Sequence, residues 1–209
     1  MRLRIKFEKT EAMQYTGNLD LHKSLSRTFR RARLPMKYSQ GFNPRPQINL
    51  AAPLALGITS EFELADFHLD EEMPVEQVAQ AIREAQPPGI RLLTLEEIDR
   101  NMPKMQKRLR TSVYRVTLLE DCDDLAERID RLMAETSVIR TRREKEYDLR
   151  PLIVGLRDLG KVDGKPVFEA ELMAAPSGGT GRSDEVVAAL GLDPFEASYH
   201  RVKLVFEEK

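Results

Sequence analysis

The first half of the chain alternates between strand-like and helix-like patterns of apolar residues. Residues 2–7 set Leu3, Ile5 and Phe7 against basic neighbours, which predicts a strand with one apolar face. In 21–33 apolar residues recur every three or four positions, which predicts a helix capped by Asn18 or Asp20. Further predictions are strands over 47–55, 61–69 and 90–95, and a helix over 75–85. This βαββαβ order is typical of a ferredoxin-like unit.

A similar order of elements follows the polar, basic stretch 100–110. The patterns predict strands over 113–119, 137–142, 167–174 and 199–206, helices over 125–134 and 184–190 with Ser183 as a cap, and a partly helical insertion over 147–159. The predicted fold class is therefore α+β, with two tandem ferredoxin-like βαββαβ units and antiparallel sheets. We expect an N-terminal unit over 1–98, a connector over 99–110 and a C-terminal unit over 111–209.

Positive charge is concentrated in one part of an otherwise balanced chain. The formal net charge is -1, yet residues 21–60 hold seven Lys or Arg and no Asp or Glu. Uncompensated bases with aromatic neighbours are typical of surfaces that bind a polyanion, and the first candidate is nucleic acid. A solvated helix face balanced by the acidic stretch 61–99 is an equally good interpretation of this pattern. The candidate nucleic-acid-binding residues are Lys23, Arg27, Arg30, Arg31, Lys37, Phe42, Asn43 and Arg45.

Residues 41–46, Gly-Phe-Asn-Pro-Arg-Pro, form the most unusual local sequence of the chain. Two prolines restrict the backbone around Arg45, so less conformational entropy is lost when that side chain engages a ligand. The alternative is a rigid linker between a helix and a strand. The segment lacks the Gly-x4-Gly-Lys-Ser/Thr pattern of a phosphate-binding P-loop.

No group of residues has a pattern that indicates catalysis or metal binding. His22, His68 and His200 are far apart, and Cys122 is the one cysteine, so we predict no metal site and no cofactor. His22 could act as an acid or base on RNA, but a structural role is the more common one for a histidine on a helix. The glycine-rich stretch 177–182 precedes a short helix and is interpreted as a flexible loop. We assign no catalytic residue, and the residues favour binding over catalysis.

Composition places the chain among soluble folded proteins. Apolar residues make up 41% and charged residues 32% of it. No stretch approaches the roughly 18 apolar residues of a membrane span, and residues 1–7 lack the apolar region of a secretory signal. We therefore expect no membrane association and a cytoplasmic location.

Several segments together resemble a bacterial domain family of unknown function that is linked to radical SAM enzymes. The motifs are Asn18-Leu19-Asp20-Leu21, Phe29-Arg30-Arg31-Ala32, Tyr38–Pro46, Pro53–Gly57, Ser60–Glu63, Tyr147–Pro151 and Arg182–Val186. The segment around Gly-Phe-Asn-Pro is the most specific of them. The chain departs from the family at Asn18 and Arg45, where relatives usually have His, and at Ser183, where they usually have Pro.

The resemblance implies an accessory role beside a radical SAM protein, with RNA modification as the setting. This chain lacks the Cys-x3-Cys-x2-Cys motif, so it cannot hold the iron–sulfur cluster itself. The leading hypothesis is a non-catalytic protein that binds RNA or presents a substrate to that partner. One alternative is an RNA-processing enzyme similar to the CRISPR repeat-RNA endonucleases, with His22 or a tyrosine as acid or base. Another is an adaptor whose basic face meets an acidic protein.

Overall fold

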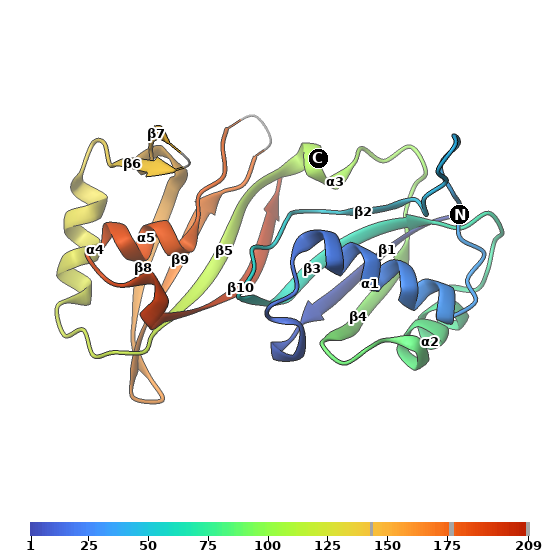
Figure 1. The fold of residues 1–209 in the computed structure, drawn as a ribbon, viewed down its shortest axis with the longest axis horizontal. Helices are drawn as coiled ribbons and strands as arrows, with labels where there is room; N and C mark the ends of the chain where they lie inside the picture. The colour runs from blue at the N-terminus through green and yellow to red at the C-terminus, as the bar shows by residue number, and fades with distance from the viewer. Residues whose placement is uncertain (143, 176–177, 208–209) are drawn as a thin grey trace. The chain divides into compact units, whose positions relative to one another are not determined.

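The computed structural model describes residues 1–142, 144–175 and 178–207, and it divides into two compact units. The first unit is Met1–Gln106 and the second is Lys107–Lys209. Each unit combines helices with an antiparallel sheet, so the fold class is α+β (Figure 1). Among the described residues no helix is long and apolar enough to cross a membrane.

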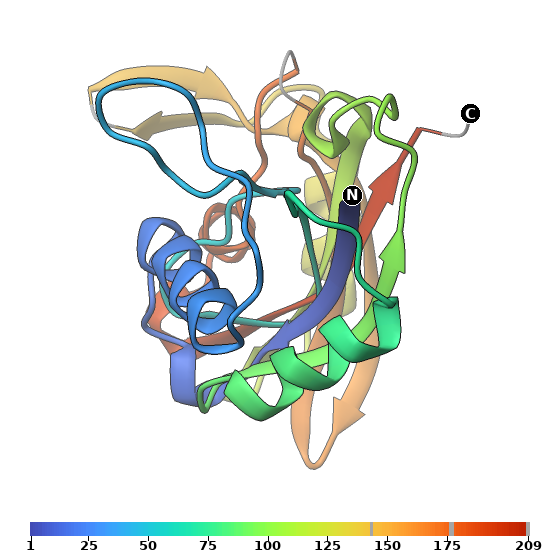
Figure 2. The same ribbon diagram turned by 90° about the vertical axis from the view of Figure 1, so that its right-hand side faces the viewer.

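The first unit has the element order βαββαβ. Its strands are β1 (Arg2–Lys9), β2 (Ile48–Leu50), β3 (Ile58–His68) and β4 (Ile90–Glu97), and its helices are α1 (Asn18–Arg31) and α2 (Val75–Ala85). The strands pair in the order β4-β1-β3-β2, and every pair is antiparallel. Helices α1 and α2 lie side by side on one face of this sheet (Figures 1 and 2).

The core of the first unit lies between its two helices and its sheet. The period-two pattern of β1 places Leu3, Ile5 and Phe7 on the helix side, where all three are fully buried. The α1 side chains that repeat every four residues pack against them, and the ring centroid of Phe29 lies 4.4 Å from that of Phe67 in β3. Because the apolar side of α1 faces the sheet, its basic side faces away from the core.

The opposite face of the first sheet carries a buried ion cluster. The Asp66 carboxylate, only 1% exposed, accepts hydrogen bonds from Arg2 Nη2 at 2.7 Å and from Arg4 Nε at 2.8 Å. Arg4 lies directly opposite Asp66 across the β1–β3 ladder. Arg2 also donates from Nη1 to the carbonyl oxygens of Met102 and Arg100, which ties the segment after β4 to this face.

The second unit follows a single-turn helix, α3 (Met105–Arg108), that spans the boundary between the units. The elements of the second unit are β5 (Leu109–Leu118), α4 (Leu125–Ala134), β6 (Ile139–Arg142), β7 (Lys145–Asp148), β8 (Ile153–Val162), β9 (Lys165–Met173), α5 (Ser183–Ala189) and β10 (Ala197–Phe206). Four strands pair antiparallel in the order β10-β5-β9-β8, and β6 and β7 form a separate hairpin.

The sequence prediction for residues 137–159 was wrong in two respects. Residues 139–142 are a strand, but they belong to the separate hairpin, and the sheet instead contains β8. Of the segment 147–159, expected to be partly helical, only Arg150–Leu152 is helical, as one turn of 3-10 helix, and residues 153–159 are strand. The overlooked signal is Asp163-Gly164, whose φ angles of 51° and 78° match the two-residue turn that joins paired strands. This turn joins β8 to β9 and so sets their pairing.

Three local predictions also differ from the structure. Helix α1 starts at Asn18 after Gly17, with no side-chain cap, so neither Asn18 nor Asp20 caps it. Helix α5 follows Arg182, and Ser183 is its first residue rather than a cap. The strand expected over 47–55 is limited to Ile48–Leu50, because Pro53 has no N–H to continue a ladder.

Candidate nucleic-acid interface

Helix α1 presents three of the predicted bases on one exposed side. Lys23, Arg27 and Arg30 follow one another at four- and three-residue spacing, so they share a face of the helix. Leu21 and Leu25 occupy the opposite face and are buried. The helix therefore projects a basic stripe because its apolar side is held by the sheet.

Two of the predicted bases already have partners within the first unit. Lys23 Nζ lies 3.0 Å from the carboxylate of Asp20, one turn earlier on α1, and both side chains are exposed. Arg31 donates from Nε and Nη2, at 3.2 and 2.6 Å, to the carbonyl oxygen of Ala85. Because Ala85 is the last residue of α2, this guanidinium satisfies a carbonyl that the helix leaves unpaired. Arg31 thus links the ends of the two helices.

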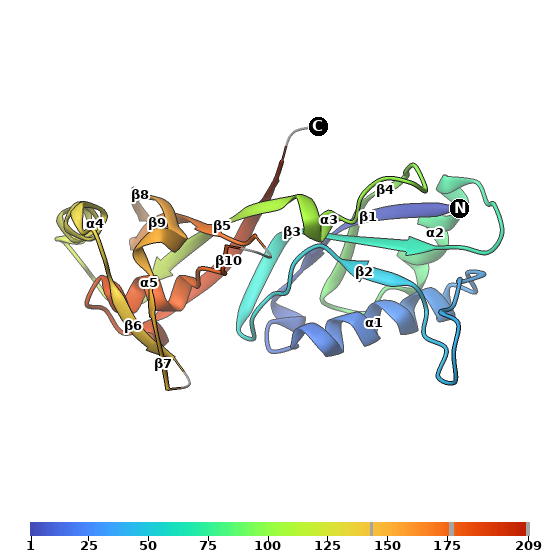
Figure 3. The same ribbon diagram turned by 90° about the horizontal axis from the view of Figure 1, so that it is seen from above.

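The remaining predicted residues lie in the segment between α1 and β2, which forms a narrow loop. Tyr38 and Pro46 form an isolated antiparallel bridge, and Ser39 N donates to the Arg45 carbonyl at 2.8 Å. Arg45 N in turn donates to Ser39 Oγ at 3.0 Å. We call residues 38–46 the 38–46 loop, and its chain extends away from the sheet and the helices of its unit (Figures 2 and 3). Phe42, Asn43 and Arg45 are all exposed on it.

Five exposed bases have no ion pair or side-chain hydrogen bond to any residue that the structure describes. They are Arg27, Arg30, Arg33, Lys37 and Arg45, which we call the basic surface. Within the described residues, none of them pairs with an acid of the stretch 61–99, so the interpretation of the stripe as a charge-balanced face is not supported by contacts. Unpaired guanidiniums keep their full set of donors for oxygen atoms of a ligand.

A cleft of about 630 Å³ lies next to the basic surface, between the C-terminal ends of α1 and α2. Arg31 and Arg33 line it on one side, and Glu84 with Pro87 and Pro88 on the other. Arg33 takes a left-handed backbone conformation, with φ of 54°, directly after the helix. The cleft mixes both signs of charge, so it is a poorer anion site than the exposed bases beside it.

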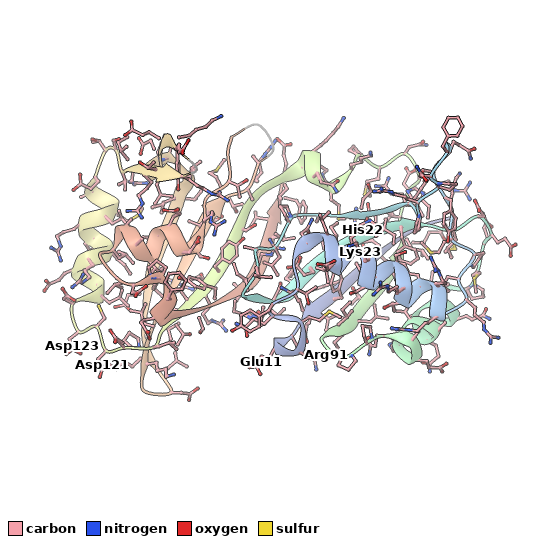
Figure 4. The ribbon with its side chains drawn as sticks, in the orientation of Figure 1. Glu11, His22, Lys23, Arg91, Asp121 and Asp123 are labelled. Carbon is pink, nitrogen blue, oxygen red and sulfur yellow. The ribbon has the colours of Figure 1, made fainter. Side chains whose placement is uncertain are left out.

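His22 and Lys23 are neighbours on α1 (Figure 4), but they have different surroundings. The His22 Nε2 atom lies 3.2 Å from the carbonyl oxygen of Ile48, so the ring links α1 to β2. This contact engages Nε2, one of the two ring nitrogens through which His22 could exchange a proton. His68 is half-buried on β3, where burial and then the charge of Arg2 lower the pKa of its imidazole.

The second unit gathers a polar cluster that the sequence patterns did not indicate. Arg140 on β6 pairs with Glu185 at 3.0 Å, and Arg182 pairs with Asp184 through its Nε and Nη2 donors. Burial, followed by the charge of Glu185, raises the pKa of the nearby Tyr147 phenol. The segments 147–151 and 182–186, singled out above as motifs, therefore meet in space.

Two residues of the 147–151 motif hold the local backbone together. Arg150 donates to the carbonyl oxygens of Glu135, Met133 and Ile153 at 3.0–3.1 Å, which satisfies the end of α4. The Asp148 carboxylate accepts from Val138 N at 2.8 Å and from Arg150 N at 3.0 Å, and the Val138 bond is the main cause of a lowered pKa at Asp148. These contacts give the motif a structural purpose.

Of the predicted glycine-rich loop 177–182, residue 177 lies outside the described residues. Gly181 is buried, and a Cβ there would lie 2.9 Å from the carbonyl oxygen of Leu152, so this part of the loop packs against the β8 end of the unit. Across residues 1–142, 144–175 and 178–207, no group of three or more His, Cys, Asp or Glu residues has the geometry to hold a metal ion.

Comparison with known proteins places this α+β chain in a family. The chain belongs to the family described as "Uncharacterized protein conserved in bacteria (DUF2344)", whose model matches residues 2–182. No curated protein matches it.

Solved structures share the fold at low sequence identity. One chain of the "Crystal Structure of a Cbf5-Nop10-Gar1 Complex" is 12% identical, with a TM-score of 0.50 over 99% of this chain and 50% of that one. A chain of the archaeal box H/ACA sRNP Nop10-Cbf5 complex is 11% identical, with a TM-score of 0.46 over 99% of this chain and 49% of its own length. This chain thus spans about half the length of these two solved chains. The likeness to the first of them, at 12% identity, shows the fold alone.

Proposed function

We propose that this protein is a non-catalytic RNA-binding accessory protein that presents RNA to a radical SAM enzyme. The observation that carries the proposal is the basic surface, in which five exposed bases lack partners among the described residues. Phosphate contacts by such bases release counterions and supply most of the sequence-independent affinity for RNA. Lys23 and Arg31, although predicted, contribute less because Asp20 and Ala85 engage them.

Within this proposal each unit is ferredoxin-like, and the connector expected over 99–110 ends at Arg108, since β5 begins at Leu109. The support is that both sheets follow one order: β4-β1-β3-β2 in the first unit and β10-β5-β9-β8 in the second. The β6–β7 hairpin is then an insertion between the first helix and the second strand of the second unit. The link to a radical SAM partner rests on the motif resemblance. Recovery of a protein with a Cys-x3-Cys-x2-Cys motif on the tagged chain tests that link.

Removal of three bases of the basic surface should weaken RNA binding in a salt-dependent way. We expect the variant Arg27→Ala, Arg30→Ala, Arg45→Ala to flatten the slope of log affinity against log salt by roughly two to three, because each phosphate contact contributes about 0.7 to 0.9. Fluorescence anisotropy of a labelled single-stranded oligoribonucleotide, titrated at several salt concentrations, measures this slope. The fold should be unaffected, since exposed charges contribute ~1 kcal/mol or less to stability.

The control variant removes an equal charge elsewhere. Arg115→Ala, Arg131→Ala, Lys165→Ala takes three exposed bases from the second unit and should leave the slope unchanged. If the variant Arg27→Ala, Arg30→Ala, Arg45→Ala is folded and binds RNA like the unmodified protein at every salt concentration, the basic surface is not the site. Absence of RNA binding by the unmodified protein at low salt would overturn the proposed function and leave the adaptor hypothesis.

A further inference from the structure

The 38–46 loop holds an aromatic ring entirely outside the protein. The side chain of Phe42 has a relative exposure of 106%, whereas Phe7, Phe29 and Phe67 of the same unit are fully buried. A Cβ on the neighbouring Gly41 would have no atom within 4 Å, so the tip of the loop is open on that side too. An exposed phenyl ring forgoes the roughly 1.5–3 kcal/mol that burial of such a side chain contributes, so the ring is available to pack against a ligand.

The stem of the loop is held firmly, which fixes where the ring is presented. The Tyr38–Pro46 bridge, the paired Ser39 and Arg45 hydrogen bonds, and the 3.2 Å bond from Gln47 Nε2 to the Tyr38 carbonyl all lie below the tip. Pro44 and Pro46 restrict the backbone of the second half of the loop. Less entropy is then lost when the tip meets a ligand.

The charges around the ring select the kind of ligand. No acid occurs in residues 21–60, and the unpaired Arg45 and Lys37 belong to the same loop and its stem. The second unit offers a comparison: Phe195 is 91% exposed, but its immediate surroundings include Asp193 and Glu196. An apolar ring among unpaired bases suits a ligand that combines phosphates with flat, aromatic groups. Nucleic acid has that combination.

Stacking restricts the ligand further. A base inside a duplex has both faces covered by its neighbours, so an incoming ring can stack only on a base that is unpaired, displaced or at the end of the duplex. We propose that Phe42 stacks on an unpaired base, an inference that rests on the proposed function. The substrate class is then RNA with single-stranded or bulged nucleotides. The basic surface supplies the phosphate contacts, and the ring supplies the preference for unpaired regions.

The absence of tryptophan from the chain allows a direct test. In the variant Phe42→Trp the single indole reports on the loop tip, and stacking on a base quenches its emission. The probes are a single-stranded oligoadenylate of ~12 nucleotides, within the span that one small binding unit covers, and a blunt RNA duplex of the same length. We expect strong quenching with the single strand and little with the duplex at equal saturation by anisotropy. Phe195→Trp is the matched control and should not be quenched by either probe.

Affinity gives a second, independent measurement. Phe42→Leu keeps an apolar side chain but removes the π-face, so it should weaken single-strand binding about 5- to 140-fold, equivalent to ~1–3 kcal/mol per stacked base, with an unchanged salt slope. Phe195→Leu should bind as the unmodified protein does.

Several results would overturn the inference, and they differ from those that overturn the proposed function. Anisotropy that shows binding without quenching of the indole in Phe42→Trp, or equal affinity of Phe42→Leu, would refute stacking and leave the basic surface as the site. Absence of binding to either probe would refute both proposals. A concentration-dependent blue shift of the same indole without RNA would mean that a second copy of the chain covers the ring, which also refutes stacking.

Discussion

Replacement of Asp66 by Asn should lower the free energy of unfolding by about 3–5 kcal/mol, because it leaves the buried Arg2 and the partly buried Arg4 without their counter-charge. Asp66 accepts from Arg2 Nη2 and Arg4 Nε at 2.7 and 2.8 Å, and the Arg2 side chain is almost as buried as the carboxylate. Urea denaturation followed by circular dichroism measures the change. The exposed pair of Lys23 with Asp20 provides the matched control, and Asp20→Asn should change stability by ~1 kcal/mol or less.

A second variant tests whether the uncompensated charge of the two arginines is the cause of this loss. Simultaneous replacement of Arg2 and Arg4 by Met and of Asp66 by Leu removes all three charges at similar volume, and should recover most of the stability lost in Asp66→Asn. If Asp66→Asn is as stable as Asp20→Asn, the cluster does not stabilise the first sheet and the interpretation is wrong.

Replacement of Gly89 by Ala should destabilise the first unit by about 2–5 kcal/mol in total, from two additive causes. The first is backbone strain, since Gly89 has a φ of 94°, which Ala adopts only at a cost of ~1–2 kcal/mol. The second is a clash, since the new Cβ would lie 2.8 Å from the backbone nitrogen of Met13, which a side-chain movement cannot relieve. Such overpacking costs typically ~1–3 kcal/mol. Thermal or urea unfolding measures the sum.

The variant Gly57→Ala separates the backbone strain from the clash that we expect in Gly89→Ala. Gly57 has a similar φ of 85°, but a Cβ there would meet nothing within 4 Å. The Gly57→Ala variant should therefore lose only the ~1–2 kcal/mol of stability that backbone strain costs. Equal losses in the two variants would mean that the turn before β4 shifts away from Met13 at little cost, and that the close approach is not a constraint.

The helices of the chain were predictable because their patterns are local. Residues 75–85 and 125–134 are helical in the structure with the bounds that periodicity predicts. Apolar residues three and four apart define one buried side wherever the helix finally packs. The strands were less predictable where turns, rather than alternation, decide pairing. The Asp163-Gly164 turn joins β8 to β9, and the alternation of apolar and polar residues does not indicate such a turn.

The candidate site, too, was predictable from the sequence only in its local features. The acid-free block and the amphipathic α1 are properties of the sequence, and all eight predicted residues are exposed, although their role in binding RNA stays a prediction. Sequence alone could not show that Arg31 is engaged by the end of α2, because Ala85 is 54 residues away along the chain. Nor could it show that Arg33, at the turn after α1, remains without a partner among the described residues.

The sequence by itself determined the α+β class, the helix faces and the concentration of positive charge, because these depend on neighbours within a few residues. Only the tertiary structure decided which charges are paired and which are unpaired. Asp66 is buried between two arginines of another strand, and Tyr147 lies near Glu185, 38 positions later in the chain. Such contacts form when strands and helices distant in sequence pack together, and packing is a property of the whole unit rather than of any segment.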